Sequence, residues 1–243
     1  MRRIGLAVVR ALSNVIGIRE QVREIDLRPA TTKVHRGGLV MNRRDYLKVV
    51  GALCAAVTFA LYGSPGRAAD AQPVTVLVTY HSATSNTEKM AQGVAEGAKA
   101  VAGTSVILKR VGEVAGSDLT SSDAVVVGSP VYFGNMSGEV KTFFDNWTFK
   151  FDLFRDRKMR NKVGAAFATG AAISAGKEFT ILGIHAAMLI NQMIVVSGGG
   201  GFGASATTGP DSPGIDEKEL ASARDLGQRV AEVAALIKRG SSK

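Results

Sequence analysis

The sequence predicts an open α/β domain in which a parallel sheet is covered by helices on both faces. Three observations support this fold class. From residue 74 onward, short runs rich in β-branched residues alternate with stretches of helical length. Polar or glycine-containing loops follow the ends of several of these runs. Residues 72–243 suffice for one such domain, and they contain no internal repeat and no sign of a second core.

The predicted strands are short and rich in valine. Residues 74–80 read Val-Thr-Val-Leu-Val-Thr-Tyr and open the sheet. Residues 123–129 are apolar enough for a buried central strand, which Pro130 is expected to end. The full set of predicted strands is 74–80, 104–111, 123–129, 162–168 and 193–197.

Four helices are predicted between and after these strands. In 87–102 the apolar residues recur at intervals of four, four and three positions, and Gly103 follows as a stop signal. Ser137 is a suitable N-cap for 138–147, which carries one apolar stripe. Residues 112–122, rich in Gly, Ser and Asp, are expected to form a linker. The predicted helices are 87–102, 138–147, 177–191 and 216–238.

The charge distribution separates the first 71 residues from the rest. The chain has 30 Lys and Arg against 21 Asp and Glu, a net charge of +9, but residues 1–71 alone hold 12 basic and five acidic side chains. The remainder has a surplus of only +2, so we expect no nucleic-acid binding by the globular part. The single cysteine, Cys54, and three scattered histidines offer no disulfide, zinc or haem spacing, and no metal is expected.

Residues 41–71 have the three-part layout of an export signal. Arg43 and Arg44, followed by an aromatic residue, a leucine and a lysine, resemble the twin-arginine (Tat) class of bacterial signals. An apolar segment follows at 49–62, and small residues up to Ala71 suit a cleavage site. We therefore expect Tat export to the periplasm or the cell exterior, with an uncleaved membrane anchor as the alternative.

The position of this signal determines how the remaining parts of the chain are interpreted. A signal normally begins at the initiator methionine, whereas here Met41 precedes the arginine pair. Residues 1–40 are therefore interpreted as a start-site overcall or a disordered upstream extension. Residues 72–243 are interpreted as the globular domain.

Three loops at predicted strand ends form the candidate binding site, because ligands of open α/β sheets bind beyond the carboxyl ends of the strands. Residues 82–87 supply four hydroxyls and an amide at a helix start, where backbone N–H groups can hold a phosphate without a cationic side chain. Taken alone, these residues favour the interpretation as an ordinary N-capping cluster. Residues 130–136 bring two aromatics and Gly134 to a strand end. Residues 168–176, rich in small side chains, could wrap a ring or simply turn a corner.

At these loops the chain resembles the flavodoxin-like FMN proteins, and the resemblance spans residues 74–238. Residues 82–87 are similar to the flavodoxin pattern Ser/Thr-x-Thr-Gly-x-Thr, with Ser85 in the glycine position. The run Gly-Ser-Pro-Val-Tyr-Phe-Gly-Asn-Met-Ser-Gly at 128–138 resembles WrbA-type NAD(P)H:quinone oxidoreductases, as does Ala-Thr-Gly at 168–170.

The resemblance implies a flavodoxin-like doubly wound sheet of five parallel strands in the order 2-1-3-4-5, with FMN as cofactor. It implies that 82–87 hold the FMN phosphate, that 131–135 line the isoalloxazine edge, and that 169–170 cover its other side. No side chain is expected to be catalytic, because the flavin supplies the chemistry. The implied FMN-binding residues are Ser82, Ala83, Thr84, Ser85, Asn86, Thr87, Pro130, Val131, Tyr132, Phe133, Gly134, Asn135, Thr169 and Gly170.

The chain departs from the quinone reductases at several places. Tyr132 stands where they usually have arginine, and Asn191 aligns with a histidine that faces the flavin. Residues 112–122 and 198–213 are shorter than the segments that help to build subunit contacts and the substrate mouth in those enzymes. Both quinone specificity and a homo-oligomeric state are therefore open questions at this stage.

Residues 198–203 contain the pattern G-x-G-x-x-G after a predicted strand, but a dinucleotide fingerprint also requires a helix beginning inside it and a further strand. Because 204–213 is rich in turn formers, neither is expected, and the segment is interpreted as a mobile loop near the flavin. His81, beside the phosphate loop, could touch the ligand, whereas His185 is expected to be solvated or packed and Trp147 to lie in the core.

Three functions are compatible with these patterns. The leading one is an FMN-binding oxidoreductase that transfers hydride or electrons from NAD(P)H to a quinone-like acceptor. Because NAD(P)H is scarce outside the cytoplasm, the first alternative is an exported one-electron carrier of flavodoxin type, serving a redox protein or a membrane quinol. The second alternative is a non-redox binder of another phosphate-bearing ligand.

Overall fold

The computed structural model of the chain describes residues 73–198, 201–210, 212 and 214–241. The predicted export signal at 41–71 and the interpretation of 1–40 lie outside these residues. Among the described helices, none combines the length and the hydropathy that a membrane span requires.

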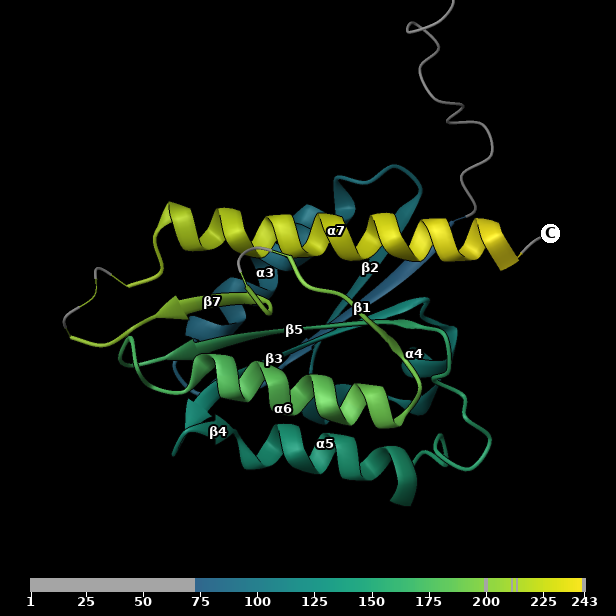
Figure 1. The fold of residues 1–243 in the computed structure, drawn as a ribbon, viewed down its shortest axis with the longest axis horizontal. Coiled ribbons are helices and arrows are strands. Elements are labelled where there is room, and N and C mark those ends of the chain that lie inside the picture. Colours follow the sequence, from purple (N-terminus) through teal and green to yellow (C-terminus); the bar gives the residue numbers. More distant parts are fainter. Residues whose placement is uncertain (1–72, 199–200, 211, 213, 242–243) are drawn as a thin grey trace, which may run out of the picture. The chain divides into compact units, whose positions relative to one another are not determined.

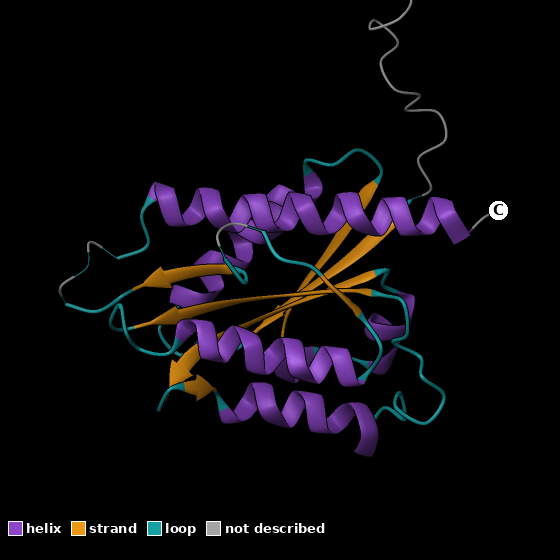
Figure 2. Ribbon diagram, viewed as in Figure 1, coloured by secondary structure: helices purple, strands orange, loops and turns teal. Residues whose placement is uncertain are grey.

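A parallel sheet forms the centre of the described domain (Figures 1 and 2). Its strands follow the order β2-β1-β3-β5-β6, and each neighbouring pair is parallel. With the predicted strands numbered along the chain, this order reads 2-1-3-4-5, so the predicted fold class and strand order are confirmed. The strands are β1 (Val74–Tyr80), β2 (Thr104–Arg110), β3 (Ala124–Tyr132), β5 (Val163–Gly170) and β6 (Ile194–Val195).

The fifth position in the sheet is split between two short strands. Strand β6 pairs with β5 only at Val163 and Gly164, near the beginning of β5. A further strand, β7 (Ala204–Thr207), pairs in parallel with the end of β5, from Phe167 to Gly170. The expectation that no strand follows residue 203 was therefore wrong. Strand β7 reads Ala-Ser-Ala-Thr, and it forms because its small side chains fit beside the fully buried β5, although they carry little strand propensity.

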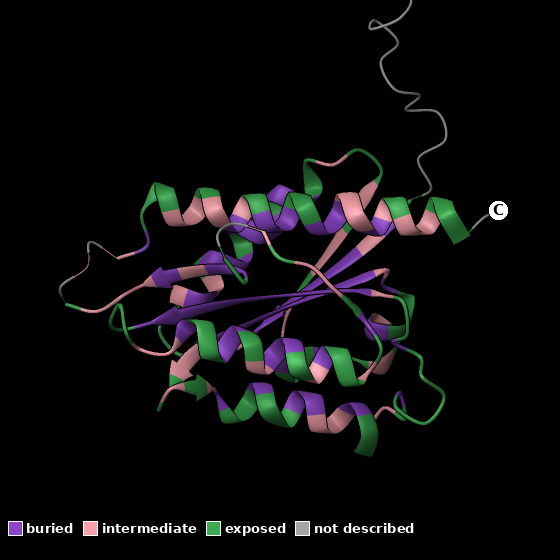
Figure 3. Ribbon diagram, viewed as in Figure 1, coloured by how far each residue is buried: buried purple, intermediate pink, exposed green. Residues whose placement is uncertain are grey.

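Two layers of helices enclose the sheet (Figures 1 and 3). Helices α3 (Asn86–Lys99) and α7 (Glu217–Ser241) pack on one face over the valines of β1. Helices α5 (Gly138–Phe149) and α6 (Lys177–Ile190) pack with the short α4 (Gly116–Ser121) on the other. Figure 3 shows buried strands between helices whose outer sides are exposed. The predicted core position of Trp147 is confirmed, since it is 1% exposed.

Glycine allows helices α3 and α7 to approach each other at the level of the backbone. A Cβ atom at Gly97 of α3 would lie 1.8 Å from the carbonyl oxygen of Arg224, and one at Gly227 of α7 would lie 1.9 Å from that of Val94. Real Cβ atoms do not reach such distances, so the two helices can cross this closely only because both positions lack a side chain.

Two segments predicted as irregular contain regular structure. The expected linker 112–122 holds a 3₁₀ turn (Val111–Glu113) and α4, whose Leu119 is fully buried against the sheet. Strand β3 does not stop at Pro130 but continues to Tyr132, where it pairs in an antiparallel manner with β4 (Asn135–Met136). Since β1 pairs with β3 only as far as Gly128, Pro130 lies where one side of the ladder is already absent and its missing N–H is tolerated.

Candidate functional site

Three loops meet beyond the carboxyl ends of β1, β3 and β5, which are neighbours in the sheet. The hydroxyl of Thr87, at the start of α3, lies 2.8 Å from that of Thr169 at the end of β5. A Cβ atom at Gly176, in the loop after β5, would lie 3.0 Å from the Cα of Gly134 in the loop after β3. The structure therefore brings together the three segments that the sequence singled out as a binding site.

The first loop ends in a helix N-terminus that no side chain caps. Ser85 precedes α3 with a left-handed backbone, φ 61°, and its side chain forms no capping hydrogen bond. The first N–H groups of α3 consequently point beyond the helix with no intrahelical acceptor. Ser82 is buried, and its hydroxyl has no hydrogen-bond partner among the described residues. A buried hydroxyl without a partner is costly, and this one is available to donate to a ligand bound at the loop.

The remaining predicted residues of this loop differ in their surroundings. Ala83 and Thr84 are exposed, and the Asn86 side-chain amide donates to the Thr84 hydroxyl at 3.2 Å. Thr87 is 2% exposed and faces Thr169 rather than solvent. The loop thus presents both exposed and buried hydroxyls, together with backbone donors, and no cation of its own.

Arg110, at the end of β2, holds the first loop in place, and it was not predicted from the sequence as a site residue. Its guanidinium donates to the carbonyl oxygen of Ser82 at 2.7 Å and to the carboxylate of Glu88 at 2.8 Å. Tyr80 donates to the other oxygen of Glu88 at 2.8 Å, and burial, together with this hydrogen bond, raises the pKa of Tyr80. Glu88 is the acidic side chain in the first turn of α3, and Arg110 and Tyr80 hold it in place. The guanidinium balances its negative charge, which would otherwise repel an anion bound at the helix N-terminus.

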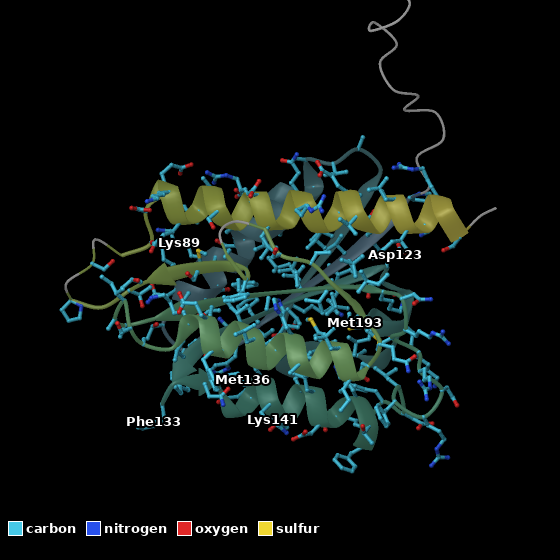
Figure 4. All side chains as sticks on the ribbon, in the orientation of Figure 1. Lys89, Asp123, Phe133, Met136, Lys141 and Met193 are labelled. Carbon is cyan, nitrogen blue, oxygen red and sulfur yellow. The ribbon has the colours of Figure 1, made fainter. Side chains whose placement is uncertain are left out.

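The second loop is a two-residue hairpin between β3 and β4. Its central residues, Phe133 and Gly134, both have positive φ values, 51° and 79°, as a type I′ turn requires. The Phe133 side chain is fully exposed and extends away from the hairpin (Figure 4), and the Tyr132 side chain is 42% exposed. A bulky residue in this conformation, with its ring in solvent, is an outlier that calls for a functional reason.

The base of the hairpin is held by Ser129. Its hydroxyl donates to the carbonyl oxygen of Pro130 at 2.8 Å and accepts the backbone N–H of Ser137 at 2.9 Å. Ser137 in turn accepts the N–H of Val140, so the predicted N-cap of α5 is confirmed. Val131 and Asn135 lie on the two strands of the hairpin, and Asn135 is exposed. The hairpin is therefore rigid at its base while its tip is free to contact a ligand.

The third loop is held by a buried lysine that was not predicted as a site residue. Lys177 is 5% exposed, and its ammonium donates to the carbonyl oxygens of Ala172 and Ile173 and to the hydroxyl of Thr207 in β7. Gly170 makes room for it, since a Cβ there would lie 3.0 Å from the Lys177 Cγ. The loop is thereby tied to β7, and the backbone of Thr169 and Gly170 stays at the site.

An open groove of about 650 Å³ adjoins the first loop on its α5 side. His81 lies in it, with Nε2 3.6 Å from the carboxylate of Glu139, and the groove is also lined by Arg110 and Asn146. A hydrogen bond from its own backbone N–H, a bond to Ser137 and the charge of His81 lower the pKa of Glu139. Of the residues predicted to bind the cofactor, none lines this groove, so it is a separate polar surface beside the site.

Three other candidates from the sequence lie away from the loops. Asn191 follows the C-terminus of α6, at the opposite end of that helix from Lys177, and its amide donates to the carbonyl oxygen of Ala187. His185 is packed against the core, which is one of the two environments expected for it. Burial lowers its pKa. In the glycine-rich segment, a strand follows Gly203 instead of a helix, so the requirement for a dinucleotide fingerprint is not met.

The residues present fit the phosphate and ring of a flavin mononucleotide. The partnerless Ser82 hydroxyl and the uncapped α3 N-terminus offer neutral donors for a dianion. The exposed aromatic hairpin and the clamped third loop lie on neighbouring strand ends, as a flat ring would need. Among the described residues, no group of three His, Cys, Asp or Glu side chains is arranged to hold a metal ion.

Comparison with known proteins identifies relatives of the chain. Residues 113–207 match the family described as NADPH-dependent FMN reductase. The chain is 34% identical over 199 residues to an NAD(P)H dehydrogenase (quinone) of Chromohalobacter salexigens, covering 67% of this chain and 98% of that protein. It is 32% identical over 206 residues to the protein of the same name from Geotalea uraniireducens, covering 68% and 99%.

The fold has solved counterparts as well. The crystal structure of the flavodoxin, WrbA-like protein from Agrobacterium tumefaciens superposes with a TM-score of 0.57 at 27% identity, covering 67% of this chain and 98% of that one. A flavodoxin from the domain Archaea, at 22% identity and a TM-score of 0.54, shares the fold. Because the relatives are matched over almost their whole length, the chain belongs to the flavodoxin-fold family of proteins named NAD(P)H dehydrogenase (quinone).

Proposed function

We propose that this protein is an FMN-dependent oxidoreductase that transfers electrons from NAD(P)H to a quinone. The observation that carries the proposal is the meeting of three loops beyond the ends of β1, β3 and β5, the first of which holds a partnerless buried hydroxyl, in a chain whose relatives of full-length similarity are named NAD(P)H dehydrogenase (quinone). None of the predicted binding residues has an imidazole, thiol or carboxylate, so the reactive group must come from a bound cofactor.

In this proposal the first loop holds the phosphate of FMN. The hydroxyl groups of Ser82 and Thr84 and the N–H groups at the start of α3 donate to the phosphate oxygens. Arg110 does not need to contact the phosphate, because it already binds the Ser82 carbonyl and the Glu88 carboxylate. Its role is to hold the loop in the conformation that exposes these donors and to balance the charge of Glu88.

The second and third loops position the ring. Phe133 and Tyr132 are available to cover a flat surface, and Gly134 lets the backbone come close to it. Lys177 keeps Thr169 and Gly170 in place on the other side by binding two carbonyl oxygens of their loop. When bound, the isoalloxazine ring supplies the redox chemistry, since it accepts hydride from a nicotinamide and passes electrons to an acceptor.

Export and an electron-carrier role form a second candidate. The pair Arg43 and Arg44 followed by an apolar segment supports the proposal that the protein is exported by the Tat route, which carries folded proteins with their cofactors. Because NAD(P)H is scarce outside the cytoplasm, an exported protein would favour one-electron exchange with a redox protein or a membrane quinol. The same FMN site would serve this function.

One set of spectra tests these proposals. The purified chain is expected to be yellow or to quench the fluorescence of added FMN; NADH should bleach it, and benzoquinone should restore the colour. Accumulation of a long-lived blue semiquinone on photoreduction, without bleaching by NADH, would favour the electron carrier. A colourless protein with no affinity for FMN would leave only the non-redox binder of a phosphate-bearing ligand.

A further inference from the structure

Basic side chains are concentrated in one loop of the domain. This basic loop, residues 150–162, joins α5 to β5 and holds six basic and two acidic side chains. The rest of 72–243 holds 12 basic and 14 acidic side chains, so the loop is a cationic patch on an otherwise slightly acidic domain. Its basic residues are Lys150, Arg155, Arg157, Lys158, Arg160 and Lys162.

Three arginines of the basic loop present their charges to solvent. Arg155, Arg157 and Arg160 are exposed, and none of them forms an ion pair with another described residue. Arg155 and Arg157 line one cavity of about 310 Å³. Arg160 lines a second, of about 250 Å³, with Lys162 and Lys238. Neighbouring like charges repel one another, so this arrangement favours an anionic partner.

The basic loop has a defined conformation although it lies at the surface. The side chains of Leu153 and Met159 anchor it in the core, with exposures of 1% and 0%. The backbone N–H of Leu153 donates to the carbonyl oxygen of Trp147 at 2.7 Å, and that of Asn161 donates to Gln192 at 3.0 Å. A loop that is already ordered loses little conformational entropy when it binds a partner.

The basic loop lies at the opposite end of the sheet from the three binding loops. It precedes β5, whereas the binding loops follow the strands, and the eight residues of β5 span roughly 26 Å at 3.3 Å per residue. Figure 4 shows Asp123, which directly precedes β3, and Phe133 of the hairpin at opposite ends of the domain. A redox partner bound to the basic loop would be held far from the candidate site, so the loop is unsuited to electron transfer.

Two features at this end of the sheet favour a lipid surface. Phe149, which precedes the loop, is 85% exposed, and Phe154 within it is 48% exposed. Apolar rings beside Lys and Arg are typical of surfaces that enter the headgroup region of a membrane. Pro73 precedes β1 and so lies at this same end of the parallel sheet. The apolar segment 49–62 ends 11 residues before Pro73, and if it stays uncleaved it would anchor the chain at this end.

We propose that the basic loop docks the domain on the surface of an anionic lipid membrane. Arg155, Arg157 and Arg160 donate to the phosphate oxygens of the headgroups, and Phe149 and Phe154 enter the interface beside them. Clusters of about four to eight Lys and Arg are typical of such surfaces. The three binding loops then face the aqueous side, where soluble donors and acceptors can reach them. The inference concerns where the domain docks and does not depend on the proposed function.

Cosedimentation of the full chain with vesicles tests the charges. The wild-type chain should bind vesicles of phosphatidylglycerol and phosphatidylcholine more tightly than vesicles of phosphatidylcholine alone. Arg155→Glu/Arg157→Glu should weaken binding to the anionic vesicles by at least about 30-fold, the effect of removing two cationic contacts with an anionic surface. Raising the salt concentration from about 0.1 M to about 1 M should abolish the difference between the two kinds of vesicle.

Lys218→Glu/Arg229→Glu is the matched control for the charge reversal. Both residues are exposed on α7, outside the basic loop, and the change in net charge is the same. This variant should bind nearly as tightly as wild type. Because every chain keeps residues 49–62, the apolar segment contributes equally to all of them. Equal binding by the wild type and the loop variant, or equal losses in the loop variant and the control, would overturn the proposal.

A second pair of variants tests the apolar contribution and the class of partner. Phe154→Ser should weaken binding to the anionic vesicles about 10-fold, because a ring no longer enters the interface. Phe202→Ser is its control, since Phe202 is 51% exposed and Phe154 48%, and it should bind as wild type does. Tighter binding of the wild type to duplex DNA than to anionic vesicles would identify nucleic acid as the partner and overturn the proposal. The thermal midpoint and FMN content of all variants should match wild type, which separates a docking defect from misfolding or a failed flavin site.

Discussion

Three residues of the candidate site are held in unfavourable states. Ser85 and Phe133 adopt left-handed backbone conformations that cost a residue with a side chain on the order of 1 kcal/mol each. Ser82 buries a hydroxyl with no partner among the described residues. These three costs fall in two neighbouring loops, where bound phosphate and ring would offset them. At the residue scale, the fold gives up stability where it is expected to bind a ligand.

Ser82→Ala should therefore separate ligand affinity from stability. We expect about a 10-fold loss of FMN affinity, corresponding to one hydrogen bond to a charged acceptor. The thermal midpoint without FMN should stay unchanged or rise, because an unsatisfied hydroxyl is removed. Ser105→Ala, at an exposed position of β2 outside the three loops, is the control for general disturbance. Fluorescence titration and calorimetry measure both quantities, and a destabilised variant with unchanged FMN affinity would contradict the assignment.

Some residues of the site could be found from the sequence and others could not. The loop residues from Ser82 to Thr87 stand out because they form a continuous polar run between a strand and a helix. Arg110 lies 28 positions from the Ser82 carbonyl that it binds, and Lys177 lies 30 positions from Thr207. No local pattern links such pairs, since it is the order of the strands that brings them together.

At the scale of elements, the packing of α3 on α7 depends on two glycines. Gly227→Ala should reduce the free energy of unfolding by about 2–4 kcal/mol, because the new methyl group would meet the carbonyl of Val94 and force the helices apart. Gly240→Ala on the same helix has open space around it and should be neutral or stabilising by up to about 1 kcal/mol. Urea unfolding of both variants measures the contrast, and equal effects would show that the close crossing does not matter.

The short helix α4 should make stability depend on acidic pH. The hydrogen bond from Lys109 and the backbone N–H of Ala115 lower the pKa of Asp118. A carboxyl with a lowered folded pKa stabilises the fold above its unfolded pKa, about 3.9, and this contribution is lost as the pH falls through the folded value. Asp118→Asn should cost about 0.5–1 kcal/mol near neutral pH and less at about pH 3. Urea midpoints at the two pH values test this, and a pH-independent loss would exclude it.

The sequence predicted long elements well and short ones poorly. The first strand, 74–80, has the bounds that were predicted, because its β-branched residues leave no other choice. Strand β7 was missed because Ala-Ser-Ala-Thr has no such preference, and α4 was missed because its Gly and Ser residues are typical of linkers. Both are stabilised by contacts with distant parts of the chain rather than by their own composition.

At the scale of the whole molecule, the fold positions the binding loops at the strand ends, and these loops define the function. The fold class and the strand order could be predicted from the sequence, whereas the cofactor-binding residues at the strand ends stay a prediction. The exposure of apolar side chains on α6 could not be predicted, because it depends on how the helix lies on the sheet. The proposed export is a property of the chain outside the described domain.

Replacement of Arg43 and Arg44 by lysine should block export if the proposal is right. Lysine keeps the charge but not the planar guanidinium, so a receptor specific for arginine pairs should no longer bind the signal. Fractionation of bacteria that produce the wild-type and the lysine variant measures the periplasmic share. Lysine substitution at Arg2 and Arg3 is the control, and equal export of both variants would argue against the Tat route.

The divided fifth strand has a consequence for solubility. Strand β6 has two residues with which a further strand could pair, and β7 has four. Residues 196–203 separate the two strands along the chain. An incoming chain could therefore form only a few main-chain bonds along this border before the ladder is broken. This border should resist the edge-to-edge growth that produces amyloid-like fibres, even when the protein is concentrated for the experiments above.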